Sequence, residues 1–408
     1  MLKFIEGGVC AAQGFQAAGI HVGVKTHAAW KKDVALIVSD VDCAAAAVFT
    51  KNVVKAAPIH VDKAHLADGR ARAVIANSGN ANACAPHGEE NAERMCAAAA
   101  KAIGCKAEDV LVSSTGVIGQ TLNVRVIEDG MPELYAALER SAEASDAAAH
   151  AIMTTDTAKK EVAVETTVGG KTVRMGGIAK GSGMIHPNMG TMLCFLTTDC
   201  AISPEMIKTA LLETVGVSFN RISVDGDTST NDTCMVLANG LAGNETITAE
   251  GPDYEAFLEA LQALCIELAK KMASDGEGAK HLITCTVSGG LDETQAETIS
   301  KSVIASSLMK AAIFGADANW GRVLCAMGYS GADFDPEKVD VSFASAAGSV
   351  QVCANGRGLD FDEAKAKEIL TEHDVEILIS MGEGGASCTC WGCDLTYEYV
   401  KINGDYRT

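Results

Sequence analysis

The sequence predicts a mixed α/β fold in which helices cover mixed β-sheets. Segments with strand periodicity alternate with amphipathic helical segments along the chain. Several strand candidates are joined by short turns, as where Gly169-Gly170 separates Glu161–Thr167 from Lys171–Arg174. Because parallel neighbours need long crossover connections, these short turns favour mixed sheets over a purely parallel, doubly wound sheet. A length of 408 residues predicts two domains, or three.

The first half of the chain contains strand candidates that end in polar loops. A helix over Glu89–Ile103 is expected to stop at Gly104, since glycine readily adopts the left-handed conformation of a helix end. A second amphipathic helix is predicted over Pro132–Ala149, with proline in its first turn. The expected strands are Val34–Val38, Ala44–Phe49, Ala73–Ile75 and Val110–Val112.

The second half continues the alternation without a linker. A helix is expected after Ser203, and a longer one is expected to be capped by Asp253 and to end near residues 275–278. Further helices are predicted over Glu293–Met309 and Phe361–Leu370. The expected strands are Met192–Leu196, Leu282–Val287, Val339–Phe343 and Val350–Cys353.

The net charge and the cysteine content indicate which partners and which compartment to expect for this protein. A formal net charge of −20 argues against nucleic acid or an anionic membrane as the main partner. The chain has no apolar run of membrane-spanning length and begins without a recognisable export signal, so we expect a cytoplasmic protein. The fifteen scattered cysteines are then expected to be reduced, and Cys388, Cys390 and Cys393 to be buried thiols rather than half a zinc site.

The Gly190-Thr191 pair is the candidate reactive point of the chain. It closes a loop of small residues, Gly181–Gly190, and directly precedes a strand candidate. If the bond before Thr191 is cut by the protein itself, Thr191 gains a free α-amine beside its hydroxyl, which makes a nucleophile and its base in one residue. An α-amine titrates near about 7.7–8.0, and nearby Lys180 would lower that value through like-charge repulsion. A buried threonine at a strand start, with Lys180 as a solvated loop charge, is the simpler alternative.

Two other loops bear on this chemistry. Acyl transfer needs donors for an oxyanion, and Ser114-Thr115-Gly116 after a strand is a candidate, because its glycine lets a backbone N–H face a ligand. Asp225, Asp227, Ser229 and Asn231 alternate like the start of a calcium loop, but the glycine and the final glutamate of such loops are missing. We therefore expect no metal site, and a hydrogen-bonded loop that braces the strand after Thr191.

Together these motifs resemble the ornithine acetyltransferase, or ArgJ, family of arginine biosynthesis over essentially the whole chain. The matching segments are K-G-S-G-M-I-H-P-N-M-G-T-M-L, S-S-T-G-V-I-G, M-T-T-D-T, D-G-D-T-S-T-N-D-T, A-N-W-G-R and the C-terminal W-G-C-D-L-T-Y-E-Y-V-K-I-N-G-D-Y-R-T. The resemblance implies the layered sandwich shared by ArgJ and DmpA proteins and a self-cleaving precursor. Its products would be an α chain, 1–190, and a β chain, 191–408, with a smaller C-terminal subdomain, assembled as an α2β2 heterotetramer.

The resemblance also implies an activity and a set of roles. Acetyl passes from N-acetylornithine to Thr191 and then to glutamate, without a cofactor; some members also use acetyl-CoA as a donor. Thr115 and Gly116 fall on the oxyanion pair of the family. The implied substrate-binding residues are Thr154, Lys180, Thr191, Glu277, Asn403 and Thr408. Gly190 departs from the alanine that family members mostly carry before the threonine, so cleavage is expected to be slower here.

Two alternatives remain at this point. A self-processing amidohydrolase or aminopeptidase would use water where the acetyltransferase uses glutamate, and a binding protein could keep the fold without cutting itself. Glu277 and the Asn403/Thr408 end favour amino-acid recognition over hydrolysis, because ornithine offers a cationic end to a carboxylate.

Overall fold

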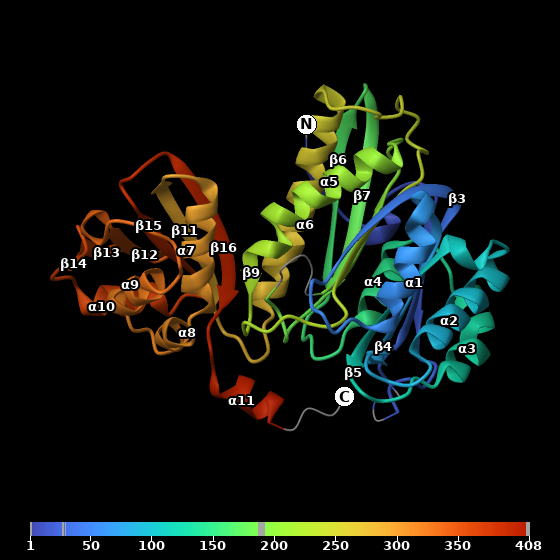
Figure 1. The fold of residues 1–408 in the computed structure, drawn as a ribbon, viewed down its shortest axis with the longest axis horizontal. Helices are drawn as coiled ribbons and strands as arrows, with labels where there is room; N and C mark the ends of the chain where they lie inside the picture. Colours follow the sequence, from blue (N-terminus) through green and yellow to red (C-terminus); the bar gives the residue numbers. More distant parts are fainter. Residues whose placement is uncertain (1, 27, 29, 187–191, 405–408) are drawn as a thin grey trace.

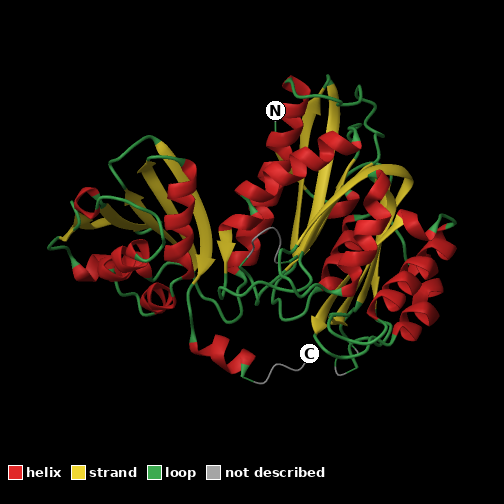
Figure 2. Ribbon diagram, viewed as in Figure 1, coloured by secondary structure: helices red, strands yellow, loops and turns green. Residues whose placement is uncertain are grey.

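The computed structural model describes residues 2–26, 28, 30–186 and 192–404. Gly190, Thr191 and Thr408 therefore lie outside the described residues, as does the rest of the predicted cleavage junction. The described chain forms two β-sheets, each covered by helices, that lie side by side (Figures 1 and 2). The predicted fold class, helices over mixed sheets, is confirmed.

The larger sheet is mixed and runs in the order β1-β6-β7-β8-β10-β3-β4-β5, with β2 also paired to β3. Strand β8 pairs antiparallel with β7 and parallel with β10, and β10 pairs antiparallel with β3. The strands are β1 (Lys3–Ile5), β2 (Phe15–Ile20), β3 (Val34–Phe49), β4 (Arg70–Asn80), β5 (Val110–Val117), β6 (Lys160–Val168), β7 (Lys171–Lys180), β8 (Leu193–Thr198) and β10 (Thr233–Ala238).

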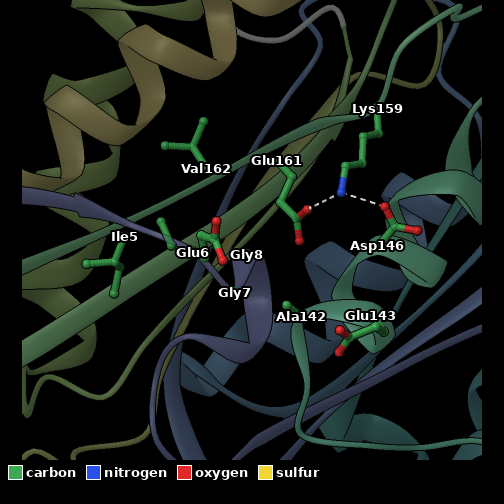
Figure 3. Close-up of a pocket in the computed structure, with 11 residues that line it drawn as sticks. Ile5, Glu6, Gly7, Gly8, Ala142, Glu143, Asp146, Lys159, Glu161 and Val162 are labelled. Atoms are coloured by element: carbon green, nitrogen blue, oxygen red, sulfur yellow. Dashed lines mark hydrogen bonds and ion pairs between the residues drawn. The ribbon is translucent and has the colours of Figure 1, made fainter.

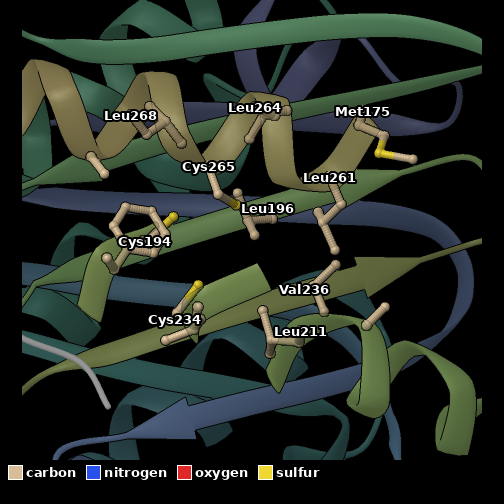
Figure 4. Packing of buried hydrophobic residues seen from close by; sticks show 14 of the residues in the cluster. Met175, Cys194, Leu196, Leu211, Cys234, Val236, Leu261, Leu264, Cys265 and Leu268 are labelled. Atoms are coloured by element: carbon tan, nitrogen blue, oxygen red, sulfur yellow. The ribbon is translucent and has the colours of Figure 1, made fainter. Parts of the chain in front are cut away.

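Helices cover both faces of this sheet because its strands carry apolar side chains on both sides. Helix α4 packs on one face, and helices α5 and α6, together with α1, α2 and α3, pack on the opposite face. The helices are α1 (Ala57–His65), α2 (Gly88–Ile103), α3 (Val124–Ala136), α4 (Ala142–Ile152), α5 (Pro204–Val217) and α6 (Pro252–Ser274). Figure 4 shows the core beneath α6, where Cys194, Cys234 and Cys265 pack among leucines.

The smaller sheet belongs to the C-terminal half and runs β14-β13-β12-β15-β11-β16-β9. Its strands are β9 (Ile222–Ser223), β11 (Leu282–Gly290), β12 (Asp340–Ser345), β13 (Gly348–Ala354), β14 (Arg357–Gly358), β15 (Asp374–Ser380) and β16 (Ala386–Cys393). Its helices are α7 (Glu293–Ala305), α8 (Ser307–Phe314), α9 (Trp320–Gly328) and α10 (Glu363–Leu370). Helix α11 (Tyr397–Asn403) then runs back toward the larger sheet (Figure 1).

Short 3-10 turns connect several elements, and turn chemistry explains the boundaries that the sequence predicts well. These turns are Gly8–Cys10, Leu66–Asp68, Ala107–Asp109, Phe219–Arg221 and Pro336–Lys338. Gly104 ends α2 at φ 85°, and the β6–β7 hairpin turns through Gly169 and Gly170 at φ 55° and 73°. The Ser203 side chain accepts a hydrogen bond from the Met206 amide at the start of α5.

Two predicted helices are each divided in the structure. The single helix over Pro132–Ala149 is two helices: Pro132 lies inside α3, and Ser141 caps α4 by accepting from the Ala144 amide. In the same way, Ser306 separates α7 from α8. In both cases the apolar spacing continues across the break and hides the capping residue.

The strand and cap errors have local causes. The two short strands predicted before residue 50 form one strand, β3. The polar residues between them are accommodated by a shift in the pairing register with β4 between Val38 and Cys43. Gly251, not Asp253, stands at the N-cap of α6. The Asp253 carboxylate instead accepts from the Gly169 amide and ties α6 to the hairpin.

The thiols behave as predicted wherever the structure describes them. Cys388, Cys390 and Cys393 on β16 are buried free thiols. Within the described ranges no group of three histidine, cysteine or acidic side chains is placed to hold a metal ion. In the same part of the chain, no helix is both long enough and apolar enough to cross a membrane.

Candidate functional site

A cavity of about 320 Å³ lies where the ends of several strands of the larger sheet meet helix α11. Every predicted site residue that the structure describes lines it: Thr115, Gly116, Thr154, Lys180, Glu277 and Asn403. They come from β5, the loop after α4, the end of β7, the turn after α6, and α11. The fold thus brings together six residues that lie up to 288 positions apart in the sequence.

The backbone conformation at position 116 requires glycine. Its φ is 134°, and a side-chain Cβ there would lie 2.3 Å from the carbonyl carbon of Gly79. Glycine is therefore required by both conformation and space. Strand β5 follows β4 in parallel up to this point, so the pair Thr115-Gly116 forms the rim of the cavity at the end of the sheet.

Lys180 is buried rather than solvated. It is the last residue of β7, and its Nζ donates to Thr115 Oγ1 at 3.3 Å. Burial lowers the pKa of Lys180, while the negative charge of Asp156 opposes that shift. A buried ammonium beside a hydroxyl is well suited to bind a carboxylate.

Asp156 organises the floor beneath Lys180. Its carboxylate accepts from the amides of Thr154 and Gly181, at 3.0 and 2.8 Å, and pairs with the Nζ of Lys160 at 2.5 Å. Lys160 also pairs with Asp275. Burial would raise the pKa of Asp156, but the charges of Lys160 and Lys180 outweigh it and hold that pKa below its usual range. This network joins the Thr154 loop, the Lys180 loop and the end of α6.

Glu277 and Asn403 also line the cavity, from the turn after α6 and from α11. Asn403 Nδ2 donates to Glu277 Oε2 at 2.6 Å, and Glu277 is 6% exposed. Gly183 makes room for this carboxylate, because a Cβ at Gly183 would lie 2.4 Å from Glu277 Oε2. A nearly buried carboxylate in the lining gives the cavity a preference for a cationic group.

The acidic loop before β10 braces the site, as predicted. The Asp225 carboxylate accepts from the amides of Met184 and Ile185, at 2.5 and 2.9 Å. Asn231 Nδ2 donates to the carbonyls of Ala81 and Ser114, at the ends of β4 and β5. The Thr233 amide donates to the Met192 carbonyl, which fixes the chain just before β8.

His186, which the sequence marks as structural, makes structural contacts. Its Nδ1 lies 3.0 Å from Ser223 Oγ, and its carbonyl accepts from Thr228 Oγ1. These contacts hold the described end of the loop that leads toward Gly190. The calcium-like alternation of the acidic loop is therefore explained by hydrogen bonds to this loop and to β4 and β5.

Sequence reasoning missed several residues of the site. Ser229, Thr230 and Asn231 line the cavity, and Asp156 and Asp232 lie buried beside Lys180. Asp156 stands within M-T-T-D-T and Asp232 within D-G-D-T-S-T-N-D-T, two of the motifs that carry the family resemblance. Only burial next to a lysine distinguishes these two carboxylates from exposed ones.

A second pocket, shown in Figure 3, contains none of the predicted site residues. It is lined by Glu6, Glu143, Asp146, Lys159 and Glu161 among others. Lys159 pairs there with both Asp146 and Glu161, at 2.5 and 2.9 Å. Its described side chains thus offer an acidic surface whose lysine is already paired.

Comparison with known proteins decides the family. The family model of the "ArgJ family" matches residues 16–408. The chain belongs to the ArgJ family. The "Arginine biosynthesis bifunctional protein ArgJ" of Symbiobacterium thermophilum is 50% identical over 408 residues, which is 100% of each chain. The same-named protein of Caldanaerobacter subterraneus is 48% identical, also over 100% of both chains.

A solved structure of an ArgJ protein is also similar. The arginine biosynthesis bifunctional protein of Bacillus halodurans shares 44% sequence identity and has a TM-score of 0.49, over 51% of this chain and 96% of that chain. The family predicted from the motifs is confirmed by the family model and the relatives. This ArgJ-family chain is accordingly an acetyltransferase of arginine biosynthesis that acts on small molecules.

Proposed function

We propose that this ArgJ-family protein moves the acetyl group of N-acetylornithine to glutamate through an acetyl ester on Thr191, after cutting itself at Gly190-Thr191. The observation that supports this most directly is the cavity itself. Its lining includes both the ammonium of Lys180 and the carboxylate of Glu277. An acylated diamino acid carries a carboxylate and a cationic side chain, and so complements both groups.

The site residues have distinct tasks in this scheme. The Thr191 hydroxyl attacks the acetyl carbonyl, and its own α-amine accepts the proton. The Gly116 amide and Thr115 stabilise the oxyanion that forms. Lys180 and Thr154 hold the α-carboxylate, and Glu277 with Asn403 holds the cationic end. The α-amine returns the proton to the departing nitrogen, and ornithine leaves as an amine. The amine of glutamate then attacks the ester, which gives N-acetylglutamate and restores the Thr191 hydroxyl.

Several parts of the scheme extend beyond the site. Acetyl-CoA is a possible second donor, the two chains are proposed to assemble as α2β2, and Thr408 is proposed to complete the binding site. The scheme needs no cofactor, and we propose a cytoplasmic location for it. A glutamate acetylation assay with acetyl-CoA as sole donor tests the first point, and sedimentation of the cleaved protein tests the second.

Thr191→Ala tests the nucleophile. The wild-type protein should give two bands on a denaturing gel, divided at Gly190-Thr191. The variant should give one band and no acetyl transfer, because both the hydroxyl and the freed amine are lost. Mass spectrometry of the β chain after incubation with N-acetylornithine alone should detect one acetyl group. An uncleaved Thr191→Ala protein with full activity would refute the mechanism.

An assay without glutamate tests the hydrolase alternative, because water is then the only acceptor. The proposed enzyme should release ornithine rapidly only when glutamate is present, since the acceptor completes each turnover. Equal rates of ornithine release with and without glutamate would instead identify an amidohydrolase.

A further inference from the structure

Asp232 is a buried carboxyl group to which the reaction scheme assigns no task. It precedes β10 and is 2% exposed. Its Oδ2 is fully buried and has no hydrogen-bond partner among the described residues. An unpaired buried acceptor is costly, so a carboxylate left in this position is unexpected unless it carries a proton or meets a ligand.

A small cavity lies beside this residue. Asp232, Lys180, Thr115 and Ser229 line a space of about 30 Å³ that adjoins the larger cavity. This volume is close to that of one water molecule. Met192 and Leu193 also line it, so it lies at the start of β8.

Lys180 has negatively charged neighbours other than Asp232. Asp156 faces Lys180 from the loop after α4, pairs with Lys160, and accepts from the Gly181 amide. Lys160 pairs in addition with Asp275, and Glu277 acts on Lys180 from the turn after α6. Among the described residues that line the small cavity, Lys180 is the only charged group besides Asp232.

We propose that Asp232 is a neutral carboxylic acid in the working protein and a positioning residue for the substrate carboxylate. As an acid it adds a hydrogen-bond donor to those of Lys180 and Thr115, so the small cavity presents donors to an incoming oxygen. As a carboxylate it would compete with the substrate for Lys180. This inference rests on the proposed role of Lys180 as the carboxylate-binding residue.

The electrostatics agree with this geometry. Burial raises the pKa of Asp232 well above its usual range, and hydrogen bonding by Ser229 and the charge of Lys180 only partly oppose the shift. The group is neutral below its raised pKa and becomes charged as the pH rises through it. Binding of a carboxylate substrate should therefore weaken toward alkaline pH.

Asp232→Asn separates the two roles, because the amide keeps the size and the donor but has no ionisation. We expect the KM of the wild-type protein for N-acetylornithine to rise toward about tenfold per pH unit above the pKa of Asp232, as the competent fraction falls. The variant should keep its kcat at neutral pH and show a smaller alkaline rise. Lys180 and the α-amine titrate in both proteins, so the difference between them isolates Asp232.

Asp227→Asn is the matched control, since it removes one exposed carboxylate from the same loop. Its pH profile should follow that of the wild type. An Asp232→Asn protein that folds but loses kcat at least about a hundredfold at every pH, with KM unchanged, would overturn the proposal, because the carboxylate would then be a required base.

An infrared difference spectrum tests the proton directly and without turnover. The wild-type spectrum minus the Asp232→Asn spectrum should contain the band of a protonated carboxyl group at neutral pH. Only a carboxylate band in that difference would refute the neutral state. If the proposed acetyl transfer itself fails, the enzyme shows no turnover while this band remains, so the two failures are distinguishable.

Discussion

At the scale of single residues, the site depends on buried charges that are held by specific partners. Lys180, Asp156 and Glu277 are all buried, and Asp156 and Glu277 each have a described hydrogen-bond donor within 3 Å. Buried charges are tolerated only when paired, and removal of one partner leaves the other uncompensated. Substitutions here should therefore act on ligand binding far more than exposed ones do.

Glu277→Gln should weaken binding of the ornithine end. A hydrogen bond to a charged group contributes about 1.5–3 kcal/mol, so the KM for N-acetylornithine should rise roughly 10- to 100-fold. Steady-state kinetics with varied donor measure this. Glu398→Gln, an exposed change at the start of α11, is the control and should leave KM unchanged. An unchanged KM in Glu277→Gln would remove Glu277 from the binding site.

The sequence could predict only those residues of the site that belong to a recognisable motif. The resemblance pointed to Thr115, Gly116, Lys180 and Glu277, and the structure places them around one cavity. Their roles remain predictions, since geometry alone does not test them. Asp232 escaped because nothing in its local sequence shows that it is buried.

At the scale of elements, turns were easier to predict than breaks. Gly104 and the Gly169-Gly170 pair have a conformational demand that only a few residue types meet. The break at Ser141 was missed because the helical spacing of alanines runs through it. Burial pattern and capping compete at such points, and the capping hydrogen bond decides the outcome.

Two glycines allow a test of the conformational contribution alone. A Cβ added at Gly170 or at Gly216 would meet no atom within 4 Å. Gly170 has φ 73° in the hairpin, whereas Gly216 lies within α5. Gly170→Ala should lower the free energy of unfolding by about 1 kcal/mol or more, and Gly216→Ala should raise it by about 0.5–1 kcal/mol.

Denaturant unfolding measures both changes. Because neither methyl group meets a neighbour, the opposite signs would come from backbone conformation. Equal effects of the two substitutions would contradict the conformational explanation.

At the scale of the whole molecule, the predicted cut would divide one sheet rather than separate two domains. The order β7-β8-β10-β3 places two strands of residues 191–408 between two strands of residues 1–190 (Figure 1). Six residue pairs join β7 to β8 and six join β10 to β3. The two products would be held together by both ladders and by the core beneath α6.

Refolding should therefore depend on cleavage. Cleaved wild-type protein should stay in one native species, and after complete unfolding its recovery should be second order in protein concentration, because two chains must meet. Uncleaved Thr191→Ala should refold at a rate independent of concentration. Stopped-flow fluorescence over a range of dilutions measures both. A rate for cleaved protein that is independent of concentration would contradict the interlocked arrangement.

The hydrogen bond from Asn403 to Glu277 has a consequence for selectivity. In the described structure Asn403 donates to one oxygen of this carboxylate, Oε2, and so fixes its orientation. In the proposed scheme an ammonium would add a charge-assisted bond to the carboxylate that Asn403 holds, whereas a neutral end would add only a weaker one. The C-terminal helix would then set the position of the group that distinguishes a cationic ligand from a neutral analogue, without a steric barrier.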